Sequence, residues 1–178
     1  MTSSSEQTAR GATPLATLNV TTAGAYERLR LLQTAKTIAM VGLSADPMRP
    51  SHFAAIYMQS EGYDIIPVNP RLVGQQILGQ TVYGSLLDIP KDRKIDIVDV
   101  FRKPEDVPAV LDDALEIGAP VFWMQLGIVN EDAAARARAA GMDVVMNRCV
   151  KIEHARFFGG LNLVGMNTGV ITSRRSIG

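Results

Sequence analysis

A loop between an apolar stretch and an expected helix holds the residues best suited to bind an anion. Residues 37–41 are apolar, Gly42 follows, and a helix is expected from Ser51 onward. Such a turn aims free backbone N–H groups and the positive end of the helix dipole at one point, where a phosphate fits. The hydroxyls of Ser44 and Ser51 and the guanidinium of Arg49 would add donors. We therefore predict a phosphate-binding loop.

The glycine content of this loop argues against an ordinary NAD site. The dinucleotide fingerprint G-x-G-x-x-G needs three glycines in six residues, and only Gly42 is present here. Ser51 also has a structural interpretation, because a serine at a helix start commonly caps the helix. We expect it to be the N-cap of a helix over residues 51–60.

Composition narrows the class of protein. With 178 residues, 47% hydrophobic and 20% charged, the chain suits one compact α/β domain. Eighteen basic residues balance eighteen acidic ones without a one-signed block, so no nucleic-acid partner is expected. The single cysteine, Cys149, fits a reducing cytoplasm, and the first 23 residues do not have the pattern of a signal peptide. No apolar run reaches the ~20 residues of a membrane span.

The elements that must position this loop alternate along the chain. Strands are expected over residues 37–43, 63–68, 95–101, 119–126 and 142–146, and helices over 26–35, 51–60, 104–117 and 133–140. This alternation, with nearly continuous apolar strands, predicts an α/β fold: a Rossmann-like, doubly wound, mostly parallel five-stranded sheet with helices on both faces. The crossover over residues 75–87 lacks strong periodicity, and we expect at most a short helix near Ser85.

The termini differ in composition from the domain between them. Residues 1–24 read as a flexible arm, residues 25–158 as the domain, and residues 159–178 as a glycine-rich extension. The extension is too apolar for a solvated tail. We expect it to pack on the domain or on a second copy of the chain, which would make a homodimer.

Polar residues follow each expected strand, where a doubly wound sheet binds its ligands. Asn69, Pro70 and Arg71 follow the second strand, at the point where NAD-binding domains place an Asp or Glu for the ribose hydroxyls. An arginine there suits a phosphate ester on the ribose, either the 2′-phosphate of NADP or the 3′-phosphate of coenzyme A (CoA). The residues themselves do not decide between NADP and CoA.

Six segments in chain order resemble one family: VGLSADPMRPSH, GYDIIPVNPR, ILGQTVYGSL, DIVDVFRKPEDVP, FWMQLGIVNEDAAARA and VVMNRCVKIEH. They are similar to the small single-domain CoA-binding proteins, and to the N-terminal domain of the succinyl-CoA synthetase α subunit. The likeness spans about residues 37–154 and recurs at the end of every strand, which makes it more specific than a lone glycine loop.

The resemblance implies a role for each strand-end residue. The pyrophosphate of CoA would be held by Gly42, Ser44, Arg49 and Ser51, the adenosine would lie along Asn69, Pro70 and Arg71, and Phe101, Arg102, Gln125 and Gly127 would line the adenine and pantetheine path. The chain departs from the family at Asn147, where an Asp is expected. That departure argues against an acid role there.

Four side chains raise the question of catalysis. The synthetase family phosphorylates a histidine, but that histidine lies in a second domain, so an exposed or capping role is expected for His154. His52 could donate one hydrogen bond to the ligand. Cys149, beside Arg148 and Lys151, has either a lowered thiol pKa or, as we favour, a small buried side chain. Trp123 is expected in the core.

The sequence therefore predicts a protein that binds CoA or an acyl-CoA as a small-molecule ligand. No catalytic residue or metal ligand is predicted, because paired carboxylates, metal-ligand spacings and a Ser-His-Asp arrangement are not recognisable. Two alternatives remain: an NADP-dependent oxidoreductase domain, and a CoA-binding subunit of an acyl-CoA ligase or acetyltransferase whose other subunit is a separate chain.

Overall fold

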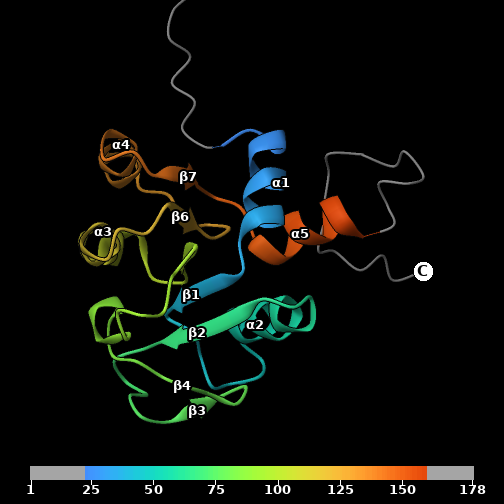
Figure 1. The fold of residues 1–178 in the computed structure, drawn as a ribbon, viewed down its shortest axis with the longest axis vertical. Helices are drawn as coiled ribbons and strands as arrows, with labels where there is room; N and C mark the ends of the chain where they lie inside the picture. Colours follow the sequence, from blue (N-terminus) through green and yellow to red (C-terminus); the bar gives the residue numbers. More distant parts are fainter. Residues whose placement is uncertain (1–22, 160–178) are drawn as a thin grey trace, which may run out of the picture.

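The fold is a five-stranded parallel sheet with helices on both faces (Figure 1), as the sequence predicts. The computed structural model describes residues 23–159. The proposed arm and extension lie outside these residues, apart from Ala23, Gly24 and Gly159. The strand order is β2-β1-β5-β6-β7. The bounds are β1 Thr37–Val41, β2 Asp64–Val68, β5 Ile97–Val100, β6 Val121–Met124 and β7 Asp143–Val145.

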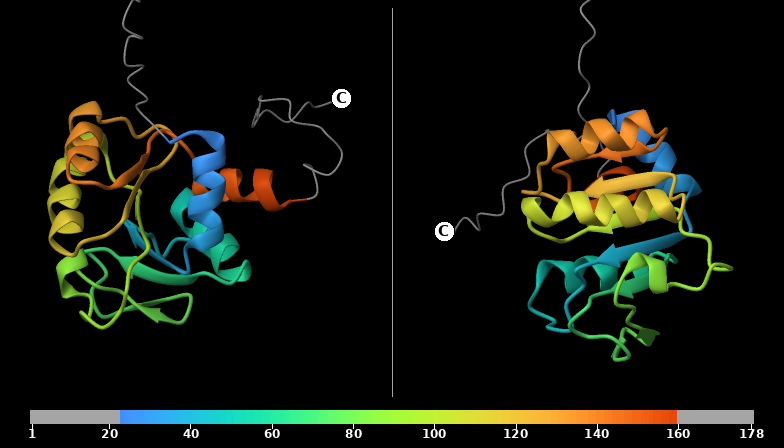
Figure 2. Two further views of the ribbon diagram at one scale, coloured as in Figure 1. Left: turned by 45° about the horizontal axis from the view of Figure 1, so that its top comes forward. Right: turned by 90° about the vertical axis from the view of Figure 1, so that its left-hand side faces the viewer.

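The helices form two layers (Figures 1 and 2). α1 (Ala25–Thr34), α2 (Pro50–Ser60) and α5 (Val150–Phe158) cover one face, and α3 (Val107–Glu116) and α4 (Glu131–Ala139) cover the other. A short 3-10 helix, η2 (Pro104–Asp106), leads into α3.

Alternation along β1 serves both layers. Ile38 and Met40 join the core under α1, α2 and α5, whereas Ala39 and Val41 join the core under α3 and α4. A strand covered on both faces must be apolar throughout, which is why these strands read as continuous hydrophobic runs. Trp123 in β6 is fully buried, as predicted, and its Nε1–H donates to the backbone oxygen of Arg148 at 2.7 Å.

The crossover between β2 and β5 is more ordered than expected. β3 (Gln76–Ile77) and β4 (Gln80–Thr81) form a small antiparallel hairpin, and η1 (Leu86–Asp88) is the short helix predicted near Ser85. Leu78 in the hairpin turn has φ 52°, a left-handed conformation that leucine rarely adopts, so the sequence does not predict a turn there. Tyr83 then pairs beside Val68 and ties the crossover to β2.

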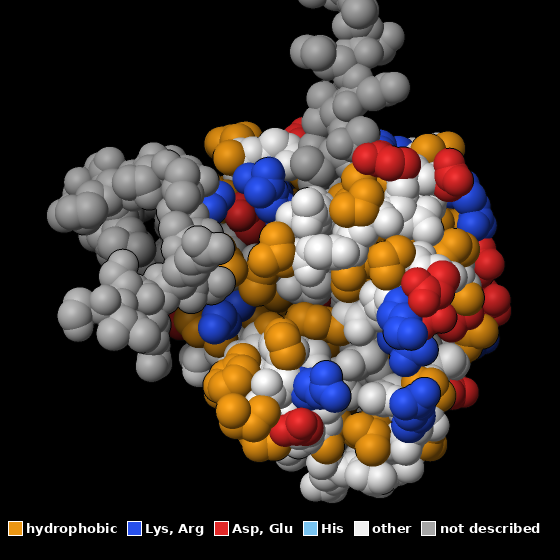
Figure 3. Space-filling model, turned by 180° about the vertical axis from the view of Figure 1, so that it is seen from behind, with side chains coloured by type: hydrophobic (Ala, Val, Ile, Leu, Met, Phe, Trp, Pro, Cys, Tyr) orange, Lys and Arg blue, Asp and Glu red, His pale blue; other side chains and the backbone are white. Residues whose placement is uncertain are grey.

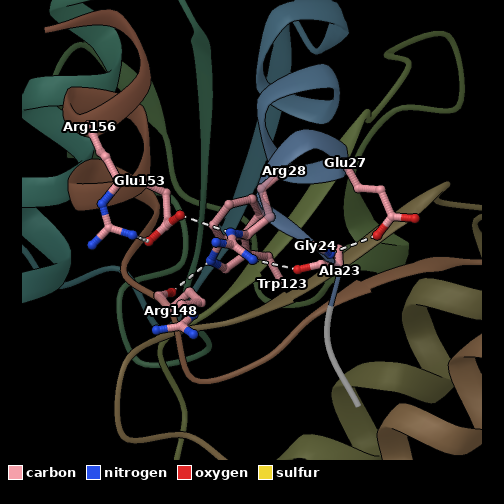
Figure 4. Close-up of polar contacts among 8 residues, drawn as sticks. All are labelled: Ala23, Gly24, Glu27, Arg28, Trp123, Arg148, Glu153 and Arg156. Carbon is pink, nitrogen blue, oxygen red and sulfur yellow. Dashed lines mark hydrogen bonds and ion pairs between the residues drawn. The ribbon is translucent and has the colours of Figure 1, made fainter. Parts of the chain in front are cut away.

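A buried ion pair joins the first and last helices (Figure 4). Nε of Arg28 in α1 lies 2.8 Å from Oε2 of Glu153 in α5, and the two side chains are 8% and 2% exposed. Arg28 also donates to the backbone oxygen of Ala23, and Glu153 accepts from Arg156 at 3.1 Å. The contact holds the first turn of α5 against α1, and that turn borders the site described next.

Candidate functional site

A cavity of about 580 Å³ opens at the carboxyl edge of the sheet. It lies between the loops after β1, β5 and β6 and the first turns of α2 and α5. The strand order reverses between β1 and β5, so this is where a doubly wound fold binds its ligand. Six predicted site residues line it: Gly42, Ser44, Arg49, Ser51, Phe101 and Gln125.

The surface at the carboxyl edge of the sheet carries basic, acidic and hydrophobic side chains. Figure 3 looks at the side toward which the strands point, and on it the Lys and Arg side chains are separated by hydrophobic and acidic ones. The cavity wall also includes residues that the sequence analysis did not assign to the site: Pro50, Leu126, Ile128, Cys149 and Ile152. Pro50, Leu126 and Ile128 adjoin predicted residues in the sequence, whereas Cys149 and Ile152 do not. Within residues 23–159 no group of three or more His, Cys, Asp or Glu side chains could hold a metal ion.

Gly42 is required by the fold as well as by the predicted loop. Its φ is +89°, and its N–H donates to the backbone oxygen of Val68 at 2.8 Å. A Cβ at this position would lie 2.7 Å from the backbone oxygen of Phe101 and 3.0 Å from Cδ of Arg102. The loop after β5 therefore approaches the loop after β1 so closely that only a hydrogen fits between them.

Two expectations for the loop after β1 are wrong. The N-cap of α2 is Arg49, and the helix begins at Pro50, so Ser51 lies inside the first turn and not at the cap. The expected set of free amides is also reduced, because the N–H groups of Ser44 and Asp46 donate to Ser51 Oγ and Ser44 Oγ, both at 3.1 Å.

The side chains of α2 close this loop instead of leaving it open. Ser51 is 5% exposed, and its hydroxyl oxygen accepts from Ser44. Nδ1 of His52 donates to the backbone oxygen of Ser44 at 2.8 Å, so this ring nitrogen does not have a free N–H to donate to a ligand. Pro50 has no N–H, which makes Ser51 the first residue of α2 with an amide to offer a ligand. Arg49 is exposed and lies 3.8 Å from Asp46.

The end of β2 is tied to the same loop. Nδ2 of Asn69 donates to the backbone oxygen of Leu43 at 2.9 Å, and Oδ1 of Asn69 accepts from the N–H of Arg71 at 3.0 Å. Asn69 thus fixes the turn that carries Pro70 and Arg71. Those two residues are exposed, and none of these three lines the cavity.

Two further predicted residues lie beside the cavity and not in its wall. Arg102 makes an ion pair with Asp106, with Nη2 and Nε at 2.9 and 3.2 Å from Oδ2. The N–H of Gly127 donates to Oδ1 of Asn147 at 2.8 Å. Asn147 has φ +57°, a conformation that Asn and Asp tolerate better than most residues, so its role here is to shape the loop after β7.

A buried polar chain underlies the cavity wall at Gln125. Nε2 of Gln125 donates to Oδ1 of Asp99 at 2.6 Å, and Oε1 of Gln125 accepts from the N–H of Val150, the first residue of α5, at 3.4 Å. Asp99 lies in β5 and is fully buried. Burial raises the pKa of Asp99 to about 8, although the hydrogen bond from Gln125 opposes the shift.

Cys149 and His154 differ from the expectations. Cys149 is half-buried and lines the cavity, so it is not the buried side chain that we favoured. Burial raises the pKa of its thiol, with a further increase from Asp99, so the alternative of a lowered pKa is also wrong. His154 is 5% exposed and is neither a surface nor a capping residue. Its ring packs against Tyr57, Tyr63 and Phe158, away from the cavity wall, and burial lowers its pKa.

The fold is that of a Rossmann-like α/β domain with a cavity at the carboxyl edge of its sheet, and the sequence comparisons identify its family. Residues 36–155 match the model of the CoA binding domain, and the chain belongs to that family. It is similar to the uncharacterized protein YneT of Bacillus subtilis (strain 168). The two are 47% identical over 125 residues, which make up 70% of this chain and 90% of YneT.

Solved structures agree with the fold. The protein cell-free ID.343 of Thermus thermophilus is 37% identical, with a TM-score of 0.73 over 76% of this chain and 100% of that one. The dinucleotide-forming acetyl-coenzyme A synthetase 1 of Ca. Korarchaeum cryptofilum shares the fold at 24% identity and a TM-score of 0.55. That likeness covers 63% of this chain and 26% of the synthetase. No helix within the described residues is long and apolar enough to cross a membrane.

Proposed function

We propose that this protein binds CoA or an acyl-CoA in the cavity at the carboxyl edge of the sheet. The observation that carries the proposal is that the predicted phosphate loop after β1 and the loops after β5 and β6 converge on one cavity, together with the first turn of α5. Membership of the CoA-binding domain family supports the choice of ligand. The lone cysteine of the chain is consistent with a cytoplasmic protein.

The pyrophosphate would lie against Gly42, Ser44, Arg49 and Ser51. Because several loop amides bond within the protein, most of the attraction would come from the exposed guanidinium of Arg49 and from the amide and dipole at the start of α2. A charged donor of this kind contributes more than a neutral one, about 1.5–3 kcal/mol.

The two ends of the ligand would meet different surroundings. The adenosine with its ribose phosphate would extend toward Asn69, Pro70 and Arg71, where Arg71 is exposed and suited to a phosphate ester. The pantetheine arm would follow Phe101, Arg102, Gln125 and Gly127 along the apolar wall. That wall includes Leu126, Ile128, Cys149 and Ile152.

Native mass spectrometry of freshly purified protein tests the ligand class, because a co-purifying CoA or acyl-CoA adds a mass that NADP does not match. Titration calorimetry with added CoA and NADP follows. We expect CoA to bind and NADP to bind weakly, since the loop lacks the glycines of a dinucleotide site. A bound NADP, or heat from NADP and none from CoA, would favour the oxidoreductase alternative.

A matched pair of variants locates the site. Arg49→Ala should weaken CoA by about tenfold to a hundredfold, the equivalent of losing one charge-assisted hydrogen bond. Arg30→Ala is the control, because Arg30 is also an exposed arginine in a surface ion pair, with Asp143, but lies outside the cavity. Equal affinities for the two variants would remove the loop after β1 from the site.

A further inference from the structure

A carboxylic acid lies where the fold would normally place an apolar side chain. Asp99 is in the middle of β5, opposite Met40 of β1 and Trp123 of β6, and it is fully buried. Within residues 23–159 no ion pair compensates it. An unpaired buried carboxylate is costly, so the group is stable here only as the neutral acid.

The hydrogen bonds of Asp99 indicate where its proton lies. Oδ1 accepts from Nε2 of Gln125 at 2.6 Å, and Oδ2 has no hydrogen-bond partner within the structure. The oxygen that accepts from an amide serves as the carbonyl oxygen of the acid, which leaves the proton on Oδ2. Buried polar atoms without partners are rare in native proteins, so this oxygen needs an explanation.

Gln125 connects this acid to the ligand cavity. Its side chain lines the cavity, and its two amide atoms bond Asp99 below and the first N–H of α5 beside it. The acid is therefore one residue behind the cavity wall. A negative charge on Asp99 would lie beneath the space that the polyanionic CoA occupies in the proposed function.

We propose that Asp99 is the buried acid of the ligand site, which remains protonated while the anionic ligand is bound, so that ligand and proton are held together. The proposal rests on the proposed CoA site. Its physical basis is charge repulsion in a medium of low dielectric constant. There an ionised Asp99 would weaken the binding of a pyrophosphate, and a bound pyrophosphate would disfavour ionisation of Asp99. The coupling is reciprocal: the ligand raises the proton affinity of Asp99, and loss of the proton lowers the ligand affinity.

The titration of Asp99 must be distinguished from that of the other ionisable groups at this edge of the sheet. Arg49 is the N-cap of α2 and His52 lies in its first turn, Arg102 follows β5, and Cys149 and Lys151 lie at the start of α5. Burial raises the pKa of the Cys149 thiol, and the nearby Asp99 raises it further. The titration of Cys149, and that of the free thiol of CoA, would overlap with the acid, so both are removed in the experiment.

The experiment uses acetyl-CoA, whose sulfur is a thioester, and a Cys149→Ala background. Calorimetry from about pH 7 to about pH 9.5, in two buffers of different ionisation enthalpy, gives both the affinity and the protons taken up. Above the midpoint of the acid, we expect the affinity to fall by up to about tenfold for each pH unit. Proton uptake should be small near pH 7 and should approach one proton per acetyl-CoA near the upper end of the range. Asp99→Asn in the same background should show neither effect, because an asparagine still accepts from Gln125 and cannot ionise.

The outcomes separate the two proposals. If acetyl-CoA does not bind at neutral pH, both the CoA site and the role of Asp99 are overturned. If it binds above the midpoint of the acid without proton uptake, or if Asp99→Asn loses affinity with pH as its parent does, the role of Asp99 alone is overturned. Should Asp99→Asn not fold, carbon NMR of the Asp99 carboxyl in the parent decides. Its titration midpoint must move upward when acetyl-CoA is added, and a midpoint that stays in place contradicts the proposal.

Discussion

Replacing Gly42 by alanine should destabilise the protein more than the same change at any left-handed glycine in open space. At Gly42 the new Cβ would lie 2.7 Å from the backbone oxygen of Phe101, and φ is +89°. The left-handed conformation costs an alanine about 1–2 kcal/mol. Relieving a contact with a backbone atom adds about 1–3 kcal/mol, as for other overpacked sites. We expect a total loss of about 2–5 kcal/mol in the free energy of unfolding.

Gly141 is the matched control, because its φ is +88° and a Cβ there would meet nothing within 4 Å. Gly141→Ala should therefore lose only the backbone component, about 1–2 kcal/mol. The change in unfolded-chain entropy is the same for both variants and cancels. Urea unfolding followed by the fluorescence of the single tryptophan, Trp123, measures the difference. Equal free energies of unfolding would show that the two loops separate freely, and the argument that the fold requires this glycine would fail.

Three further predictions test separate parts of the structure. Glu153→Ala should cost about 3–5 kcal/mol in urea unfolding because it leaves Arg28 buried and unpaired, whereas Asp143→Ala, which removes the partner of exposed Arg30, should cost less than about 1 kcal/mol; similar losses would contradict the burial of the first pair. Burial lowers the pKa of His154 from 6.5, so the unfolded chain binds that proton more readily. Stability should be full above this value and fall as the pH drops through it, and His154→Phe should flatten that part of a pH series of unfolding curves. Arg71→Ala should weaken CoA by about 1.5–3 kcal/mol in calorimetry and leave dephospho-CoA nearly unchanged, and equal losses would show that Arg71 does not recognise the ribose phosphate.

The sequence predicts the fold well because its strands are buried on both faces. A run such as residues 38–41 is apolar at every position, and glycine or proline residues separate the elements that follow it, so the order of strands and helices can be predicted. The ends of the strands are less readable. β6 begins at Val121 and ends at Met124, shorter than the apolar stretch that contains it, because the flanking residues turn into loops.

The parts of the site that the sequence misses depend on contacts between distant elements. Ser51 looks like a cap because it follows a proline, but the chain already turns at Arg49, and the hydroxyl of Ser51 accepts from Ser44 across the loop. His154 looks exposed in its own helix, yet Tyr57 from α2 and Tyr63 before β2 enclose it. Neither result follows from local pattern, since both depend on how helices pack over the sheet.

The same packing predicts the outcome of an enzymatic test. Forming a thioester from a free acid needs activation by a nucleotide phosphate, and in the synthetases that this chain resembles a histidine of another domain carries the phosphoryl group. His154 is poorly placed to carry a phosphoryl group, because its ring packs against Tyr57, Tyr63 and Phe158 and lies outside the cavity wall. The raised pKa of Cys149 keeps its thiol a weak nucleophile at neutral pH. We therefore expect no ATP- and CoA-dependent thioester formation from acetate or succinate by the pure protein. Turnover that disappears in His154→Ala would make this histidine catalytic and would overturn the interpretation of the chain as a ligand-binding domain.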